Sequence, residues 1–177
     1  MRPYVVLIGP PGAGKSSVGR RLAELLDLPF ADTDEMVEAQ AGKAIPDIFI
    51  EDGEPKFREF EAEAVRAALA EHDGVLSLGG GAIMDPETRA ALGSHRVVFL
   101  TVGLAAASPR VGFSRNRPLL IGSPRKQWLQ LFQQREPLYL EAADLTVATD
   151  ELTVHEVAEV VLSETRRMDE VDGHGHR

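Results

Sequence analysis

The sequence predicts an α/β protein, a three-layer α/β/α sandwich built around a five-stranded parallel sheet. The first observation is that short β-branched runs alternate with segments whose apolar residues recur at helical spacing. This alternation is typical of parallel strands joined by helices that cover both faces of the sheet. The second is that no repeat and no long linker divides the 177 residues, a length that suits one domain with its own core.

Five short apolar or β-branched segments are predicted as strands. The first, "YVVLI" (4–8), has the unbroken apolar character of a strand that is buried on both faces of a parallel sheet. The other four are "LPFADTD" (28–34), "GVLSLGGG" (74–81), "RVVFLTV" (96–102) and "ADLTVAT" (143–149).

Helical patterns fill the intervals between these strands. The stretch "KSSVGRRLAELLDL" places Val18, Leu22, Leu25 and Leu26 at helical spacing directly after the first strand. Residues 33–71 are expected to be mostly helical, with breaks near "AGKAIPD" and "EDGEP" because glycine and proline interrupt helices.

The later helices have clear start signals and less clear ends. Asp85 as N-cap and Pro86 at the first helical position open a short helix. The next helix, "RKQWLQLFQQREPLYL", is predicted to end at about Arg135, and a last amphipathic helix covers 153–167. The polar residues 169–177 are predicted to be a disordered tail.

Composition and charge exclude several classes of partner. The net charge of −9 does not favour binding of the whole surface to nucleic acid or to an anionic membrane. The absence of cysteine excludes disulfides and thiolate metal sites. Because the apolar runs are far too short for a signal sequence or a membrane span, we expect a cytoplasmic protein.

The loop "GPPGAGKS" (9–16) matches the phosphate-binding pattern G-x-x-x-x-G-K-[ST] in full. Its glycines allow backbone N–H groups to point inward at a phosphate, and the helix that follows directs its positive end at the same point. Lys15 adds a full positive charge, and the Ser16 hydroxyl is suited to ligate Mg²⁺. A chance glycine turn is the alternative, but the position between a strand and a helix favours binding of a nucleoside triphosphate.

Two carboxylates, Asp32 and Asp34, flank Thr33 at the end of the second predicted strand. Ligands of α/β sheets bind at the carboxyl ends of the strands. One carboxylate would then hold Mg²⁺ through water while the other accepts a proton from an acceptor hydroxyl. The alternative is structural, with Asp32 or Thr33 as the cap of the following helix.

The segment "EPKFREFEAEAV" (54–65) carries a possible anion-binding arginine. Phe57, Arg58 and Glu61 share one side of the predicted helix, and Arg58 and Glu61 are close enough to pair. An arginine held by a glutamate makes a fixed fork for a carboxylate. A solvated helix face is the alternative.

Three glycines follow the third predicted strand in "SLGGGA" (77–82). Because glycine has no side chain, a small polar ligand can approach this backbone closely. A tight turn is the alternative. Ser77 is placed to hydrogen-bond to a metal-bound water.

Arginines cluster in and beside residues 112–124, a stretch rich in Gly, Pro, Ser and Arg that is predicted to be a long mobile loop. Arg110, Arg115 and Arg117 stand there in an otherwise acidic chain. An arginine on a closing lid neutralises charge that develops during phosphoryl transfer. Arg135, one helix later, would add a second fork for an anionic acceptor.

Taken in order, these motifs resemble the shikimate kinase family, whose fold is the P-loop fold of nucleoside-monophosphate kinases. The resemblance runs from about residue 4 to 162 and is carried by "GPPGAGKSSVGRRLA", "DTD", "GEPKFREFE", "LSLGGGA", "RPLL" and "REPLY". It implies a monomeric kinase that phosphorylates the 3-hydroxyl of shikimate with Mg²⁺ and ATP, on the route to chorismate and the aromatic amino acids. It also implies one domain over 1–168, with a substrate-binding insert at about 33–61 and a mobile lid at about 112–124.

The resemblance implies roles for individual residues. The nucleotide site would contain Gly12, Ala13, Gly14, Lys15, Ser16, Ser17, Arg110 and Arg117. Lys15, Asp34 and Arg117 would be catalytic, and Ser16 with Asp32 would serve Mg²⁺. The shikimate site would contain Asp34, Phe57, Arg58, Gly79, Gly80, Gly81 and Arg135. Arg110 would lie over the adenine, with a loop near 149–153 on its other side. Arg115 is an extra lid arginine with no assigned role, and the stretch "GSPRKQW" before the helix of Arg135 is short.

Two other functions compete with this one. Another small-molecule kinase of the same fold, such as a gluconate or nucleoside-monophosphate kinase, would share the phosphate-binding loop. A nucleotide acceptor, however, would need groups that read a base and a phosphate. A non-catalytic nucleotide-binding module would not need the set of Asp34, Arg58 and Arg135.

Overall fold

The structure is a computed structural model that describes residues 3–111 and 123–174. The predicted lid residues 112–122, with Arg115 and Arg117, lie outside the described residues.

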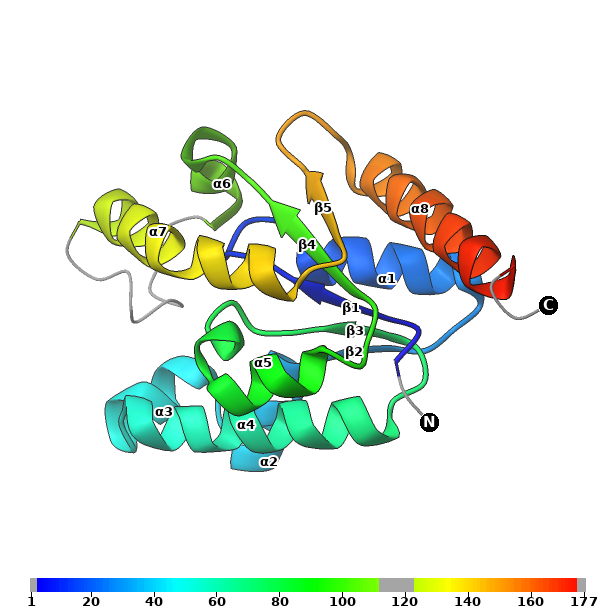
Figure 1. The fold of residues 1–177 in the computed structure, drawn as a ribbon. Coiled ribbons are helices and arrows are strands. Elements are labelled where there is room, and N and C mark those ends of the chain that lie inside the picture. The colour runs from blue at the N-terminus through cyan, green and yellow to red at the C-terminus, as the bar shows by residue number, and fades with distance from the viewer. Residues whose placement is uncertain (1–2, 112–122, 175–177) are drawn as a thin grey trace.

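A five-stranded sheet forms the centre of the molecule, as predicted (Figure 1). Its strands are β1 (Val5–Ile8), β2 (Phe30–Asp32), β3 (Val75–Ser77), β4 (Val97–Thr101) and β5 (Leu145–Ala148). Their order is β2-β3-β1-β4-β5, and every neighbouring pair is parallel. Because Ser77 is in register with both Leu7 and Asp32, the carboxyl ends of β1, β2 and β3 meet at one edge.

Helices cover both faces of the sheet (Figure 1). On one face lie α1 (Lys15–Leu26) and α8 (Val154–His174), which pack on each other. On the other lie α4 (Glu54–Glu71), α5 (Pro86–Leu92) and the second half of α7 (Pro124–Ala142). The short helices α2 (Thr33–Ala41) and α3 (Ile45–Glu51) pack against α4, while α6 (Leu104–Val111) and η1 (Ala82–Met84) follow strand ends.

The sheet separates two hydrophobic cores, which explains the stability of the three layers. Alternate residues of β1 point to opposite faces, so Val5 and Leu7 pack with α1 and α8, while Val6 and Ile8 pack with α4 and α5. All four of these side chains are buried. A third, smaller cluster joins α2, α3 and α4 around Val37, Ile48 and Phe57.

Two helices extend beyond their predicted ends. Helix α7 passes through Pro137 and ends at Ala142. A proline inside a helix removes one backbone hydrogen bond, but here burial of Tyr139 against Phe99 holds the last turns on the sheet. Helix α8 reaches His174, so residues 169–174 of the expected disordered tail are helical. An ion pair between Asp169 and Arg96 fastens this extension to the start of β4.

The sequence did not predict helix α6, which the structure contains. Its sequence, "LAAASPRV", is short and contains Pro109, so local signals for a helix are weak. Ala107 and Val111 of α6 are buried, and they lie against the loop that follows β1. They approach it so closely that a Cβ added to Gly12 would meet both side chains. Tertiary packing therefore stabilises this helix.

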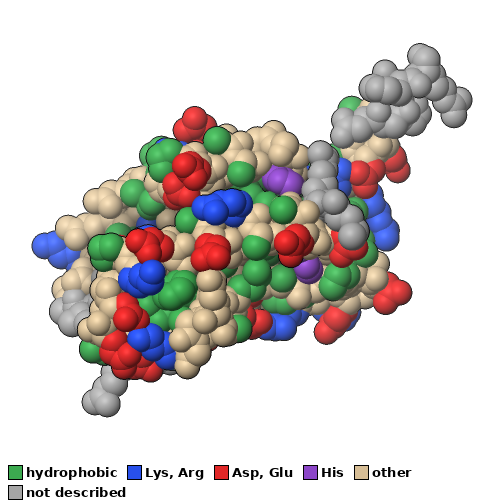
Figure 2. All heavy atoms as spheres, turned by 90° about the horizontal axis from the view of Figure 1, so that it is seen from below, with side chains coloured by type: hydrophobic (Ala, Val, Ile, Leu, Met, Phe, Trp, Pro, Cys, Tyr) green, Lys and Arg blue, Asp and Glu red, His purple; other side chains and the backbone are tan. Residues whose placement is uncertain are grey.

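Acidic and basic side chains are interspersed on the face shown in Figure 2, below α2, α3 and α4. Lys43, in the turn before α3, for example, pairs with Glu51 at the end of that helix and with Asp52 just after it. Within the described residues, no helix has the length and apolar character that crossing a bilayer requires.

Candidate active site

Two cavities meet above the carboxyl ends of β1, β2 and β3. One, of about 500 Å³, follows the loop after β1 and the start of α1. The other, of about 560 Å³, lies between α2, α3, α4 and α7. Five residues line both cavities: Pro11, Ser16, Asp32, Asp34 and Gly80. We call the first the nucleotide cavity and the second the acceptor cavity, and a group that passes from one to the other must pass these five residues.

We call the loop between β1 and α1, which carries the phosphate-binding sequence pattern, the phosphate cradle. Gly12 and Gly14 have φ of +86° and +87°, a left-handed conformation that favours glycine. The Lys15 ammonium donates to the carbonyl oxygens of Gly9 (2.8 Å) and Pro10 (3.1 Å). The six residues predicted for nucleotide binding from this loop, Gly12, Ala13, Gly14, Lys15, Ser16 and Ser17, all line the nucleotide cavity.

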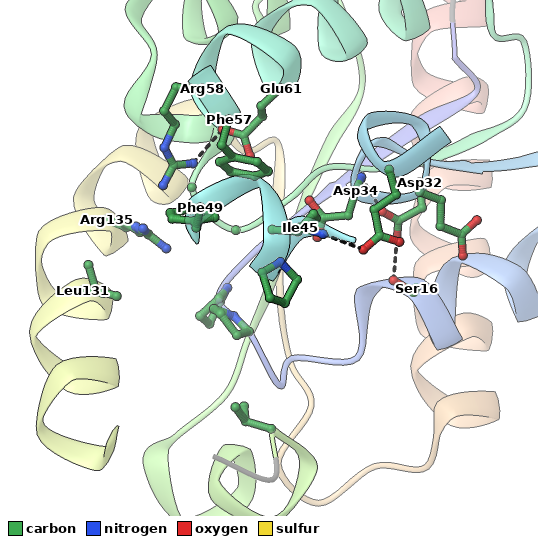
Figure 3. A pocket seen from close by; sticks show the side chains of 18 of the residues that line it. Ser16, Asp32, Asp34, Ile45, Phe49, Phe57, Arg58, Glu61, Leu131 and Arg135 are labelled. Carbon is green, nitrogen blue, oxygen red and sulfur yellow. Dashed lines mark hydrogen bonds and ion pairs between the residues drawn. The ribbon is translucent and has the colours of Figure 1, made fainter. Parts of the chain in front are cut away.

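Asp32 has the structural role that the sequence offered as the alternative, and it also contacts Ser16. It is the N-cap of α2, where its Oδ1 accepts a hydrogen bond from the Asp34 backbone N–H at 2.9 Å. Its Oδ2 accepts from the Ser16 hydroxyl at 2.5 Å (Figure 3). The cap therefore fixes one oxygen and presents the other to Ser16, at the point where the two cavities meet.

The acceptor cavity contains two arginines from different helices. The Arg58 guanidinium donates to Glu61 Oε1 at 2.7 Å, as the spacing on α4 predicts. Arg135 comes from α7, and only 6% of it is exposed. Both side chains line the cavity, and Figure 3 shows them on the same side of the view, with Asp34 on the other. Two fixed guanidinium groups opposite Asp34 make a site for a small molecule with a carboxylate at one end and a hydroxyl at the other.

Aromatic side chains form the apolar wall of this cavity. Phe57 is buried, and its ring lies 4.8 Å from that of Phe49. From α7, Trp128 and Phe132 stack with ring centroids 5.2 Å apart. Trp128 also donates its indole N–H to the Pro11 carbonyl at 2.9 Å, which ties α7 to the phosphate cradle.

Glycines after β3 let the charged groups approach the backbone. Gly80 and Gly81 line the acceptor cavity, as predicted, whereas Gly79 lines neither cavity. Gly79 instead lies beneath two carboxylates: an added Cβ would be 2.5 Å from Asp34 Oδ1 and 2.9 Å from Glu61 Oε2. A Cβ on Gly81 would be 2.3 Å from an Arg58 nitrogen.

Burial raises the pKa of the Glu61 carboxyl above its ordinary value, and Arg58 opposes this shift only in part. The folded protein therefore binds this proton more tightly than the unfolded chain does. The free energy of unfolding must then fall as pH rises from the ordinary carboxyl range through the raised pKa. We expect the midpoint of urea unfolding to fall less steeply with pH in Glu61→Gln than in the wild type. Equal slopes in the two proteins would show that the pKa of Glu61 is not raised in the folded protein.

Arg110 fastens the cradle to the loop after β5. Its guanidinium donates to the carbonyl oxygens of Gly12 (3.3 Å) and Thr149 (2.9 Å), and to the Thr149 hydroxyl (3.0 Å). Thr149, Leu152 and Thr153 line the nucleotide cavity with it. The predicted catalytic residue Arg117 lies outside the described residues.

The sequence did not point to two residues that support this site: Trp128, which lines the acceptor cavity, and Tyr139, which does not. Both are buried and both donate a hydrogen bond to a loop of the site, Trp128 to Pro11 and Tyr139 to Gly80. A buried Trp or Tyr usually finds a partner for its polar group, so an aromatic residue near Arg135 is the signal that was available.

A phosphate cradle joined to a cavity for a small anionic acceptor defines a P-loop kinase. A family model described as "Shikimate kinase" matches residues 11–166. The chain belongs to the shikimate kinase family.

Relatives and solved structures agree with this assignment. The chain is 53% identical over 163 residues to the shikimate kinase of Thermobifida fusca, covering 92% of this chain and 95% of that one. It is 56% identical over 151 residues to that of Saccharopolyspora erythraea, covering 85% and 86%. The structure of shikimate kinase from Acinetobacter baumannii in complex with shikimate superposes with a TM-score of 0.87 at 36% identity, covering 92% and 91%. A gluconokinase from Sinorhizobium meliloti, at 18% identity and a TM-score of 0.56, shares the fold alone.

Proposed function

We propose that this protein transfers the γ-phosphoryl group of ATP to the 3-hydroxyl of shikimate, which gives shikimate 3-phosphate and ADP. The step belongs to the synthesis of chorismate and the aromatic amino acids. The observation that carries the proposal is the junction of the two cavities, where Asp34 lies between the phosphate cradle and the two arginines of the acceptor cavity.

The dimensions and charges of the acceptor cavity suit shikimate. Its carboxylate would bind between Arg58 and Arg135, its ring would lie along Phe57, and its 3-hydroxyl would reach Asp34. The Asp34 carboxylate would accept a hydrogen bond from the hydroxyl, orient it for in-line attack and take up its proton as the phosphoryl group transfers. Phosphoryl transfer needs little covalent help from the protein, so positioning and charge supply most of the catalysis. The role of Lys15 would be to stabilise charge on the transferring group, together with Arg117.

The oxygen donors at the junction fit Mg²⁺. This ion binds few protein oxygens directly and keeps several waters and phosphate oxygens. Ser16 and Asp32 present such oxygens 2.5 Å apart. The hydroxyl of Ser77 lines the nucleotide cavity, is buried and has no hydrogen-bond partner in the part of the chain described, so it suits a metal-bound water. When bound, the ion would neutralise phosphate charge.

ADP release from Mg-ATP tests the proposal directly. The acceptors to compare are shikimate, quinate, gluconate, a set of nucleoside monophosphates and no acceptor. We expect a signal with shikimate that far exceeds the others. A larger signal with another acceptor would keep the phosphate cradle but overturn the roles of Arg58 and Arg135. ATP binding without turnover for any acceptor would favour a non-catalytic module.

Gly79→Ala tests whether the carboxylates need their present positions. A methyl group there would push Asp34 and Glu61 away, and misplacement of reacting groups by about 1 Å costs on the order of a hundredfold in rate. We expect kcat/KM for shikimate to fall by at least about tenfold. Gly93→Ala is the matched control, since its Cβ would meet nothing closer than 3.4 Å. Equal activity of the two variants would show that the reaction does not depend on the present positions of Asp34 and Glu61.

The cellular setting follows from the same chemistry. ATP and an anionic small molecule are the only partners that the proposed reaction needs, and we place the enzyme in the cytoplasm as a monomer. The interspersed charges in Figure 2 support neither a nucleic-acid nor a membrane surface on that face.

A further inference from the structure

The phenol of Tyr139 connects helix α7 to the glycine loop after β3. Its hydroxyl donates to the Gly80 carbonyl oxygen at 2.5 Å. The Arg135 guanidinium comes from one helical turn earlier on α7, and its charge acts on the same phenol and opposes the rise that burial causes in the Tyr139 pKa. The phenol is therefore hydrogen-bonded to the glycine loop after β3 and lies within the electrostatic influence of the arginine of α7.

The structure assigns Tyr139 as a positioning residue, whose hydroxyl holds the Arg135 guanidinium and the Gly80 peptide in the arrangement that binds the acceptor. This assignment rests on the proposed function. Tyr139 does not line the cavity itself, so it would act through these two neighbours and not through contact with substrate.

The ring of Tyr139 is itself well fixed, which is what a positioning role requires. Only 1% of the residue is exposed. Its ring stacks on Phe99 of β4, with centroids 4.9 Å apart and an interplanar angle of 26°. The sheet thus sets the location of the hydroxyl. Burial also raises the pKa of Tyr139 to about 12, so the hydroxyl remains a hydrogen-bond donor throughout the physiological range.

The consequence for the site follows from peptide geometry. In a planar trans peptide the carbonyl oxygen and the next N–H point in opposite directions. Holding the Gly80 carbonyl therefore also sets the direction of the Gly81 N–H, at a point where the backbone lines the acceptor cavity. Glycine peptides rotate easily, so this loop needs a restraint from outside.

The chain offers a matched pair of variants, because it has two tyrosines. Tyr139→Phe keeps the ring on Phe99 and removes the hydroxyl. Tyr4→Phe removes a hydroxyl that bonds to Thr165 at 3.4 Å, away from both cavities. We expect Tyr139→Phe to raise KM for shikimate by about tenfold or more, with KM for ATP within about twofold of the wild type. We expect Tyr4→Phe to change neither constant.

A double variant separates positioning from stability. In an Arg135→Lys background, Tyr139→Phe should raise KM for shikimate by a smaller factor than it does in the wild type, because part of its effect passes through Arg135. A lower melting temperature for Tyr139→Phe with an unchanged KM for shikimate would overturn the assignment and leave a structural role only. Full additivity with Arg135→Lys would also overturn it.

A readout without substrate distinguishes this inference from the proposed function. Modification of Arg135 by phenylglyoxal, located by peptide mass spectrometry, should be several-fold faster in Tyr139→Phe than in the wild type or Tyr4→Phe. Faster modification in a protein that does not phosphorylate shikimate would support the positioning role and refute the proposed acceptor. Equal modification rates in all three proteins would overturn the positioning role, whatever the acceptor.

Discussion

Lys15→Met is expected to lower kcat by about a thousandfold while the fold and acceptor binding survive. The ammonium of Lys15 would stabilise charge that develops only as the phosphoryl group transfers, and loss of one such group costs on the order of a hundredfold to a thousandfold in rate. Methionine keeps the length of the side chain, so packing in the cradle changes little. Single-turnover formation of ADP with saturating ATP and shikimate measures the effect.

The matched control for this variant is Lys56→Met, which removes a lysine on α4 that pairs with Glu59 at the surface. Its turnover should equal that of the wild type. Turnover by Lys15→Met within about tenfold of the wild type would contradict the role of Lys15 in transfer.

Arg58→Ala is expected to raise KM for shikimate by about tenfold to a hundredfold and to leave ATP binding almost intact. Charge-assisted hydrogen bonds to a carboxylate are worth about 1.5–3 kcal/mol each, and Arg58 lines only the acceptor cavity. Steady-state kinetics with each substrate varied in turn, and calorimetric titration with ATP, measure the two effects.

Two further variants make this result specific. Arg66→Ala removes an exposed arginine from the same helix and should change neither KM nor ATP binding. Arg58→Ala leaves the buried carboxyl of Glu61 without its cation, so Arg58→Ala combined with Glu61→Gln should recover stability but not shikimate binding. Equal loss of ATP and shikimate binding in Arg58→Ala would mean that Arg58 does not belong to the acceptor site.

The parts of the fold with strong local signals were predictable. Burial of a parallel strand on both faces leaves an unbroken apolar run such as "VVLI" in β1. Glycine and proline between 41 and 55 gave the breaks between α2, α3 and α4. Helix α6 and the ends of α7 and α8 depend on contacts with distant residues, such as Gly12, Phe99 and Arg96. No local pattern reports contacts of that kind.

In the candidate site, too, the features with local sequence signals were predictable and those that depend on distant contacts were not. The spacing of Arg58 and Glu61 predicted their ion pair, because residues three apart on a helix are neighbours. The approach of Asp34 and Glu61 to Gly79 was not predictable, since it requires β3, α2 and α4 to be placed in space. The hydrogen bonds of Trp128 and Tyr139 to the two loops join residues more than fifty positions apart.

Because Trp128 is hydrogen-bonded to Pro11, its intrinsic fluorescence should report on the substrate sites of this enzyme. Trp128 is the one tryptophan of the chain, so all indole emission comes from a single place. That place borders the acceptor cavity and contacts the nucleotide loop. The wavelength and intensity of indole emission depend on polarity and hydrogen bonding, so unlabelled protein should report the arrival of either substrate. The order in which the two substrates bind can then be followed in a stopped-flow fluorimeter without any engineered label.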